Sequence, residues 1–414
     1  MTLSEDFKRE LAWIYLRHVV EGSRPDVLAE LWPEGWELRR LNETPGDVTR
    51  LSGRILRRDS SLPQSLLNAT AHRYDFDPRR QWETTQRENM RILTPDSPQW
   101  PTELTDAFVR MTGTGADKDA GVRGQAEAPF ALWVRGSGDL AQLTKQSVTM
   151  VGTRAATRYG KSVTEQFATE LCASGYAIVS GGAVGIDKHA HTAALAAGAP
   201  TIALMACGVD VDYPAAHREL FQRIVAAGSL IVSEYAPGTS AARHRFLTRN
   251  RLAAALGKAT VLVEAPLRSG AMNTMNWAEA MLKPTLAVPG PVDSVSSQGA
   301  LVRIQQGRAS LVRTAQDILD VVDPLGTQLT LDLDAGESEL GANRVLDPAG
   351  QQKLSWQETA VFDAAGIESD DSGYLVQMQR DTGLDGALVM RTVRDLELKG
   401  VLLRQGERWI KVRS

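Results

Sequence analysis

The central part of this 414-residue sequence predicts an α/β fold with a doubly wound parallel sheet. Short apolar runs alternate with helical segments between residues 130 and 288, as in consecutive βαβ units. The runs lack alternating polar residues, which is typical of strands whose sheet is covered on both faces. A glycine-rich turn follows the run Tyr176–Ser180, and such turns lie where doubly wound sheets bind ligands.

These runs are the expected strands of a domain that we place at residues 86–323. They cover residues 130–134, 148–151, 176–180, 201–205, 230–233, 260–263 and 285–288. Helices are expected between them, where apolar residues recur at helical spacing or helix formers predominate, at residues 159–171, 190–197, 220–227, 251–256 and 274–282. The Gly- and Asp-rich residues 112–127 are expected to form a surface loop.

Three further segments flank this domain. Residues 1–85 predict a small helical domain, because apolar residues recur at helical spacing between Pro and Gly breaks. Residues 324–350 are acidic and poor in aromatics, so we expect a linker that does not fold alone. Residues 351–414 predict helices followed by a hairpin, the order of a winged helix. Arg391 and Arg394 there fit DNA contact, but neighbouring acids leave protein contact or packing equally open.

The composition narrows the function classes. The formal net charge of −4 provides no global basic field, so a nucleic-acid surface must be a local patch. Cys172 and Cys207 are too few for a disulfide framework or a cysteine zinc cluster, and we expect both to be buried thiols. No apolar run reaches about 18 residues and the first residues are charged, so we expect no membrane span, no signal peptide and a cytoplasmic location.

The turn Ser180–Asp187 is the first candidate site. Gly181, Gly182 and Gly185 allow positive φ and a close approach to the backbone amides, and the start of the following helix favours an anion. We therefore expect a phosphate here. The spacing is not the dinucleotide G-x-G-x-x-G, and tight packing of the turn is the alternative.

Arg154 follows the strand 148–151 and is expected to project from the carboxyl edge of the sheet into the same crevice. A guanidinium there can hold a phosphate with two hydrogen bonds, and the alternative is an arginine bound to a helix C-terminus. Ala155–Ser162 resembles a phosphate-binding loop but lacks its first glycine, and Glu264 stands where a magnesium-binding Asp is needed. An ATPase is therefore not favoured.

Arg243–Arg251 is the most basic segment of the sequence. It contains four arginines and one histidine, and no acid occurs from Ser240 to Lys258, so self-repulsion favours a bound anion. Phe246 is placed to stack on an exposed base, as in single-strand binders. The alternative is a solvated turn with Phe246 in the core.

The remaining motifs are weaker. Ser269–Thr274 is a small-residue loop leading into a helix, which offers further amides to an anion. His189 and His191 are two residues apart and do not share a helix face, so we expect no metal. No nucleophile motif is found, and we expect no catalytic residue and no cofactor.

Several modest motifs occur in one order. They are Val151–Arg154, Ser180–Asp187 with Ala190 and His191, Tyr213–Pro214, Ser233–Glu234, Phe246 with Arg249–Arg251, Ser269–Gly270 with Thr274, and Val288–Gly290. In order and spacing they resemble the DNA-processing protein A (DprA/Smf) family, over residues of about 90 to 312. The first 85 residues resemble that family's sterile-alpha-motif-like (SAM-like) domain and the last segment its winged helix.

The resemblance implies an extended Rossmann domain that binds single-stranded DNA without being an enzyme. It also implies a homodimer that protects incoming DNA and helps to load the RecA recombinase in DNA uptake, natural transformation or recombination. The DNA-binding residues it implies, together with the loops above, are Arg154, Gly181, Gly182, Gly185, Arg243, Phe246, Arg249, Asn250, Arg251, Ser269, Gly270 and Thr274. The sequence departs from the family pattern at Ala271–Asn273 and at Gln305–Ala309.

Two other classes of function remain open. A nucleotide-binding or nucleotide-hydrolysing Rossmann enzyme related to phosphoribohydrolases would use the same crevice, although the run P-G-G-x-G-T-x-x-E of those enzymes is absent. A protein-interaction scaffold would use Arg243–Arg251 as a partner surface.

Overall fold

The computed structural model describes residues 4–20, 25–31, 47–114, 127–323, 356–366, 372–382, 384–406 and 408–412. The chain divides into two compact units, Met1–Thr330 and Leu331–Ser414. The expected linker at residues 324–350 lies outside the described residues, as do residues 115–126 of the expected surface loop.

The first unit is built on one large sheet. Within the described residues its strand order is β1 (Arg91–Leu93), β2 (Leu132–Arg135), β6 (Leu230–Ser233), β5 (Thr201–Leu204), β4 (Ala177–Gly181), β3 (Ser147–Val151), β7 (Thr260–Leu262), β8 (Thr285–Ala287) and β9 (Ser310–Leu311). Neighbours from β6 to β9 are parallel, whereas β1 and β2 add an antiparallel edge. The parallel part of the sheet begins with β3, from which the chain builds outward through β4 and β5 to β6 and then returns to place β7 on the other side of β3. The predicted mostly parallel α/β sheet is confirmed, and its direction of winding reverses between β3 and β7.

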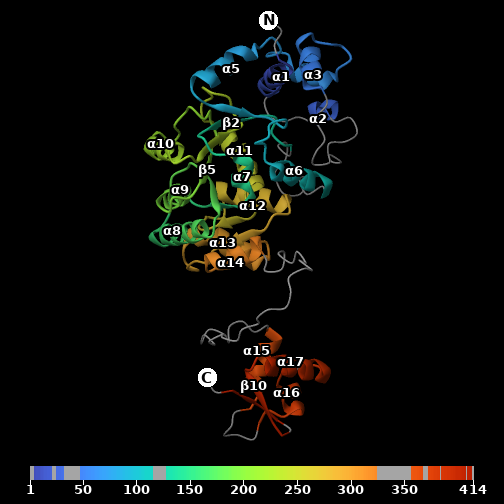
Figure 1. The fold of residues 1–414 in the computed structure, drawn as a ribbon, viewed down its shortest axis with the longest axis vertical. Coiled ribbons are helices and arrows are strands. Elements are labelled where there is room, and N and C mark those ends of the chain that lie inside the picture. Colours follow the sequence, from blue (N-terminus) through green and yellow to red (C-terminus); the bar gives the residue numbers. More distant parts are fainter. Residues whose placement is uncertain are drawn as a thin grey trace, which may run out of the picture. The chain divides into compact units, whose positions relative to one another are not determined.

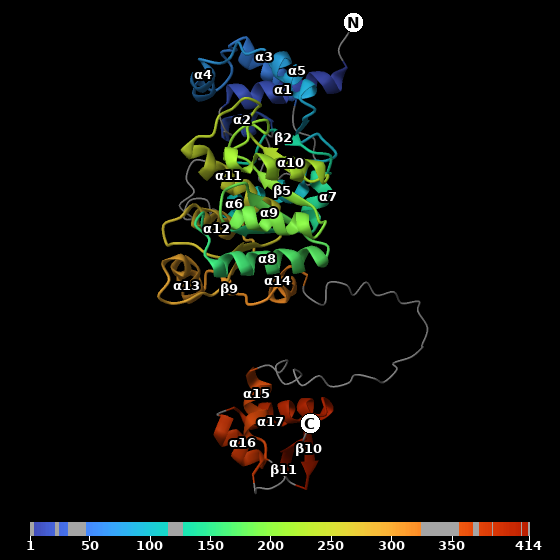
Figure 2. The ribbon, with the colours of Figure 1, turned by 90° about the vertical axis from the view of Figure 1, so that its left-hand side faces the viewer.

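Helices cover both faces of this sheet (Figures 1 and 2). One face carries α8 (Arg158–Ala173), α9 (Ile186–Ala196), α10 (Arg218–Ala226) and α14 (Ala315–Val322). The other carries α6 (Thr102–Thr114), α7 (Leu140–Lys145), α11 (Arg243–Leu256), α12 (Gly270–Ala280) and α13 (Gln298–Gln305). Consecutive strand residues serve opposite faces, as the twofold period of a strand requires. In β4, Ile178 packs with Phe167 of α8, and Val179 packs with Leu252 of α11.

The N-terminal helices belong to the first unit, and the first of them packs against the sheet. They are α1 (Glu5–Val19), α2 (Pro25–Leu31), α3 (Val48–Leu56), α4 (Gln64–Thr70) and α5 (Pro78–Arg87). Leu11 and Ile14 of α1 share a core with Trp133 of β2 and Met205. The helical content expected for residues 1–85 is present in their described part, but residue 85 is not a boundary between compact units.

The second unit contains three helices followed by a hairpin in its described part. These elements are α15 (Trp356–Ala364), α16 (Leu375–Thr382), α17 (Gly386–Leu398), β10 (Leu402–Gln405) and β11 (Arg408–Lys411). The strands pair antiparallel with Leu403 opposite Ile410, and Gly406 takes a φ of 67° between them. Val361, Met378, Val393 and Trp409 form the core. This order agrees with the expected one, and its assignment as a winged helix stays a prediction.

Two general expectations are tested by the described residues. Cys172 and Cys207 are both buried free thiols, as predicted. Among the described helices, none is long and apolar enough to cross a membrane.

Candidate nucleic-acid interface

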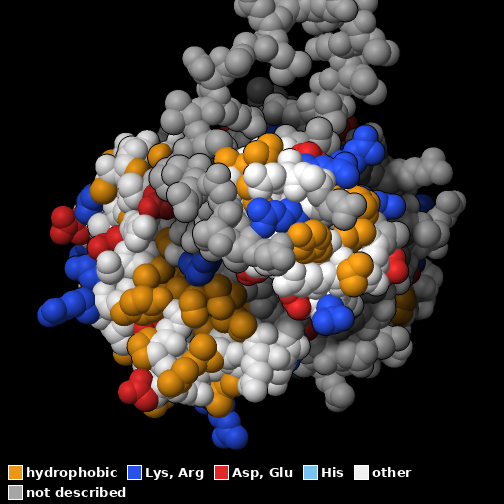
Figure 3. Space-filling view, turned by 90° about the horizontal axis from the view of Figure 1, so that it is seen from below, with side chains coloured by type: hydrophobic (Ala, Val, Ile, Leu, Met, Phe, Trp, Pro, Cys, Tyr) orange, Lys and Arg blue, Asp and Glu red, His pale blue; other side chains and the backbone are white. Residues whose placement is uncertain are grey.

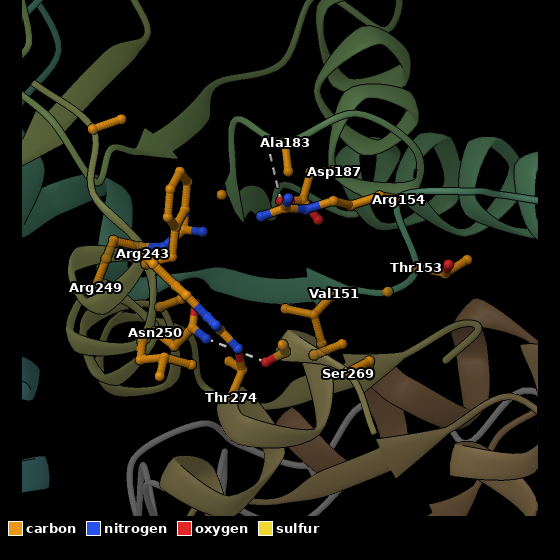
Figure 4. A pocket seen from close by; sticks show the side chains of 18 of the residues that line it. Val151, Thr153, Arg154, Ala183, Asp187, Arg243, Arg249, Asn250, Ser269 and Thr274 are labelled. Carbon is orange, nitrogen blue, oxygen red and sulfur yellow. Dashed lines mark hydrogen bonds between the residues drawn. The ribbon is translucent and has the colours of Figure 1, made fainter. Parts of the chain in front are cut away.

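A pocket of about 890 Å³ opens at the carboxyl ends of β3, β4 and β7, where the direction of winding reverses. In Figure 4, Arg154 and Asp187 project from one wall, and Asn250, Ser269 and Thr274 lie on the facing wall. The lining includes nine residues of the predicted site, namely Arg154, Gly181, Arg243, Phe246, Arg249, Asn250, Ser269, Gly270 and Thr274. Gly182 lines a smaller adjoining pocket, and Gly185 and Arg251 line neither.

The charge of the lining favours an anion. Arg154, Arg243, Arg249 and Arg268 line the pocket, and Asp187 is the one carboxylate among its lining residues. Arg154, Arg243 and Arg268 are exposed, so their guanidinium groups reach solvent and any ligand. Guanidinium donors arranged around a concave surface are the usual means of holding phosphates.

Arg154 is held by the loop that leaves β3. The Thr153 amide donates to the Glu264 carbonyl at 2.6 Å, and this bond ties the loop to the end of β7. The exposed Arg154 guanidinium then lies over the Phe246 ring, 5.4 Å from its centroid. This contact places Arg154 in the pocket wall, as the sequence predicts, and away from a helix C-terminus.

The glycine turn differs in detail from the prediction. Gly185 takes a φ of 84°, and a Cβ there would lie 2.2 Å from the Thr153 carbonyl oxygen. Gly181 and Gly182 do not have positive φ. A Cβ at Gly181 would lie 2.1 Å from Nη1 of Arg249, so the space that this glycine leaves is filled by an arginine of the chain itself.

Arg249 and Asp187 form the buried floor of the pocket. The Arg249 guanidinium donates to the Leu204 carbonyl, and its Nε has no hydrogen-bond partner. The Ala183 amide donates to the Asp187 carboxylate at 3.3 Å. Burial raises the pKa of Asp187 and lowers that of Arg249, and the attraction between the two charges opposes both shifts. A ligand phosphate would add a second anion beside Arg249.

The basic segment is one regular helix. The sequence predicts a helix only from Arg251, whereas α11 begins at Arg243. Phe246 is half-buried in the pocket wall and its ring centroid lies 5.6 Å from that of Tyr213, which is 45% exposed. Phe246 belongs to none of the buried core clusters of the described residues, so the alternative of a core residue is not supported.

The prediction that Arg251 contacts the ligand is corrected by its position. Arg251 is 1% exposed, and its Nη1 lies 2.9 Å from Oε2 of the buried Glu234. Its guanidinium also lies over the Phe108 ring. Glu234 precedes the basic segment in the sequence and supplies the anion that Arg251 requires, so this arginine stabilises the fold.

The start of α12 closes the pocket. The Asn250 side-chain amide donates to the Gly270 carbonyl and to Oδ1 of Asn273, both at 3.2 Å. These bonds fix the loop Ser269–Gly270 against α11. Ser269 is the N-cap of α12 but makes no side-chain capping bond, and the first amides of the helix lie at the pocket wall.

Ala155–Ser162 resembles a phosphate-binding loop, but the carboxylate of Glu264 takes the place of the phosphate there. Oε1 of Glu264 accepts from the Thr157 hydroxyl at 2.6 Å, and Oε2 accepts from the Thr157 amide at 3.0 Å. A Cβ at Gly160 would lie 2.0 Å from Oε2 of Glu264. The carboxylate therefore fills the start of α8, where a phosphate would sit, and Lys161 is exposed.

The histidines of α9 have partners of their own. His189 Nδ1 lies 3.2 Å from Oε1 of Glu165, and the buried His191 Nδ1 lies 2.7 Å from the Thr201 hydroxyl. No group of three or more His, Cys, Asp or Glu within the described residues is placed to hold a metal ion.

Three charged or aromatic lining residues were not among the predicted contacts. Arg268 directly precedes Ser269, the N-cap of α12. A cation just before the start of a helix is visible in the sequence and could have indicated Arg268 as a further anion contact. Asp187 ends the glycine turn, and Tyr213 belongs to a family motif. Nothing in the sequence shows that Tyr213 would lie beside Phe246.

Comparison with known proteins shows the family to which the chain belongs. The family model of DNA recombination-mediator protein A matches residues 91–323. The chain belongs to this family. It is 36% identical to a Mycobacterium tuberculosis protein named for DNA processing (DprA), over 97% of this chain and 94% of that protein. It is 38% identical to the DNA processing protein DprA of Streptococcus pneumoniae, over 47% of this chain and 67% of that protein. The solved structure of the S. pneumoniae protein matches with a TM-score of 0.56 and 26% identity, over 77% of this chain and 98% of that one.

Proposed function

We propose that this chain is a non-enzymatic protein that binds single-stranded DNA in the pocket at the carboxyl edge of its sheet. The observation that carries the proposal is the pairing of four arginines with the aromatic residues Phe246 and Tyr213 around one cavity. Arginines and the start of α12 suit phosphates, and the aromatic rings suit bases.

An unpaired strand fits this cavity better than a duplex. A base can stack on Phe246 only if it has left a base pair, since the ring lies in a pocket wall and not on a protruding element. Phosphate contacts and stacking carry little sequence information, so we expect weak sequence dependence.

The lining offers little for hydrolysis of a nucleotide. Asp187 is the one lining carboxylate, and it accepts a backbone amide beside Arg249. General acid–base cleavage of a glycosidic bond usually requires two carboxyl groups around the substrate. Glu264 is buried and held by Thr157, so it does not supply the second one.

The family description, that of a recombination mediator, supports a wider role. We infer that the chain protects incoming single strands and helps to load RecA on them in DNA uptake or recombination. RecA assembly on a strand coated with single-strand-binding protein would be faster with the chain than without it. An unchanged assembly rate would contradict this part of the proposal.

Self-association is the remaining part of the proposal. β9 is an edge strand of the sheet, and Leu311 on it is 45% exposed. Val292, Val295 and Val321 are further exposed hydrophobic residues in the same part of the chain. Figure 3 shows hydrophobic side chains gathered into a patch on the described surface. We propose that two copies of the chain associate through this edge. If the variant Leu311→Asp still sedimented as a dimer, this proposal would be contradicted.

One experiment separates the binding protein from the enzyme. A labelled single strand is titrated with the protein while turnover of ATP and of nucleoside monophosphates is measured in the same samples. We expect saturable strand binding with no turnover. Turnover that Asp187→Asn abolishes would favour the enzyme.

A further inference from the structure

Helix α11 has two faces, and only one of them lines the pocket. Phe246 and Arg249, three residues apart, belong to the lining face, and Arg249 is labelled in Figure 4. Arg245, Thr248 and Arg251 also follow one another at intervals of three residues, and they share a face that does not line the pocket. Contacts made by this second face fix the position of the first, because one helix carries both.

The second face meets Glu234 and Tyr235, two buried residues that directly follow β6. Arg251 pairs with the Glu234 carboxylate at 2.9 Å. Arg245 lies over the Tyr235 ring, 5.2 Å from its centroid. Burial raises the pKa of the Tyr235 hydroxyl, and a hydrogen bond with the Thr248 side chain opposes that shift. We call Glu234 and Tyr235 the bridge.

A third arginine, Arg17 near the end of α1, contacts the same two residues. Its Nε donates to the Glu234 carbonyl at 2.8 Å and lies 3.8 Å from Oε1 of that residue. Its guanidinium lies over the Tyr235 ring, 5.3 Å from the centroid. Arg17 is only 7% exposed, so the bridge is its main polar surrounding. The Tyr235 ring therefore contacts one arginine of α1 and one of α11.

The first turns of α11 need such support. No side chain caps the helix, and Arg243 and Arg245 place two cations at its positive end. Both features disfavour helix formation at this point. A cation over an aromatic face is attracted by the ring, so Tyr235 stabilises Arg245 where the helix dipole does not. If these turns frayed, Arg243 and Phe246 would leave the pocket wall.

We propose that Arg17 is a positioning residue for strand binding, which holds the first turns of α11 through the bridge. Arg17 lines neither the pocket nor the smaller one beside it, so it acts without touching the strand. The proposal rests on the proposed single-strand function and extends it to another part of the chain. The N-terminal helices become part of the binding apparatus, although the pocket lies at the sheet.

Arg17→Met tests the proposal, because it removes the guanidinium and keeps a long side chain. Affinity for a labelled oligothymidine strand is measured well below each melting temperature, so that every protein is folded. We expect Arg17→Met to bind at least about tenfold more weakly than the wild type, and Arg17→Lys, which keeps the cation, to recover part of the loss.

Leu66→Ala is the matched control. Leu66 of α4 is fully buried in the core of the same N-terminal helices and does not belong to the bridge. This variant should lower the melting temperature and leave the affinity within about twofold of the wild type. If Leu66→Ala weakened binding as much as Arg17→Met does, general loss of stability would explain both, and the positioning role would be overturned.

Tyr235→Leu acts on the bridge without changing α1. It removes the ring that Arg17 and Arg245 share, whereas Tyr235→Phe keeps that ring. We expect Tyr235→Leu to bind as weakly as Arg17→Met and Tyr235→Phe to bind nearly as the wild type. The double variant Arg17→Met with Tyr235→Leu should lose little more affinity than either single variant, because both act through one contact. Losses that add in full would contradict the bridge.

Hydrogen exchange shows where the effect lies and needs no DNA. In Arg17→Met the amides of residues 247–249 should exchange faster than in the wild type, and those of β4 should not. Weaker binding at unchanged exchange would mean that Arg17 contacts the strand itself and would overturn the proposal. If the wild type binds no strand, the single-strand function fails, whereas faster exchange would still show that Arg17 holds α11. If the wild type and Arg17→Met bind equally well, only the positioning role fails.

Discussion

The guanidinium of Arg154 lies over the Phe246 ring at 5.4 Å from its centroid, which joins the loop after β3 to helix α11. A cation over an aromatic face is attracted by the charge distribution of the ring. One face of Phe246 is therefore covered, and a base has the remaining surface beside Tyr213. The two residues act as one unit of the proposed interface.

Arg154→Ala should weaken single-strand binding and make its dependence on salt shallower. If Arg154 contacts one phosphate, the log–log salt slope should change by about one unit, and Arg154→Lys should retain the slope. Fluorescence anisotropy at several salt concentrations measures both. Arg223→Ala, an exposed arginine on α10 outside the lining, is the control. A slope that is the same in all four proteins would remove Arg154 from the interface.

Phe246→Ala should cost about 1–3 kcal/mol of binding free energy at nearly unchanged melting temperature, because the ring lies in the pocket wall and outside the core clusters. Affinity and melting are measured on the same variant. Leu267→Ala, exposed and outside the lining, is the control. Phe246 would instead have a structural role if the melting temperature of Phe246→Ala fell as it does for a core truncation. In that case the folded fraction of the variant would bind the strand as tightly as the wild type does.

Arg251→Ala should destabilise the fold by about 3–5 kcal/mol, because it removes the nearer ion partner of the buried Glu234 carboxylate and leaves only Arg17, whose Nε lies 3.8 Å from Oε1. Denaturant unfolding measures the loss. The double variant Arg251→Met with Glu234→Gln should recover much of it. An unchanged stability together with a shallower salt slope of DNA binding would return Arg251 to the interface.

Lys161→Ala should leave strand binding unchanged, and the wild type should show no steady ATP hydrolysis. The physical reason is that the Glu264 carboxylate accepts two hydrogen bonds from Thr157 at the start of α8 and excludes a phosphate. A coupled assay of phosphate release measures turnover. ATP hydrolysis that Lys161→Ala abolishes would contradict this reading of the loop.

Acid should destabilise the chain through His191, whose pKa burial lowers to about 3. The unfolded imidazole has a pKa near 6.5, so between these values the unfolded state binds a proton that the folded state excludes. Stability is fully present above about pH 6.5 and falls toward pH 3, by up to about 1.4 kcal/mol per pH unit from this residue. His191→Asn should show a less steep loss in urea unfolding between these pH values. If the unfolding free energy of the wild type and of His191→Asn fell equally steeply with pH, His191 would not be the cause of the loss.

The strands were predictable from the sequence because their apolar runs are continuous. Val148–Val151 and Leu230–Ser233 are buried on both sides and carry a signal that does not depend on distant residues. The first turns of α11 gave no such signal, since Arg243, Arg245 and Arg249 interrupt any apolar stripe and no side chain caps the helix. The extent of that helix becomes clear only once its packing on the sheet is known.

The site was predictable as a location and less so in its detail. The carboxyl ends of parallel strands meet at one edge, which brings Arg154, Gly181 and Ser269 together from distant segments. The role of Arg251 could not be predicted, because Glu234 pairs with it through tertiary contacts. The same holds for Gly181, whose missing side chain makes room for Arg249.

Competition between single-stranded and duplex DNA for the protein tests the central claim most directly. A labelled single strand is bound at fixed salt and displaced by an unlabelled single strand or by the duplex of the same sequence. We predict that the single strand displaces it at a much lower concentration than the duplex, because a base must leave its pair to reach Phe246. Displacement by the duplex at an equal or lower concentration would contradict the account.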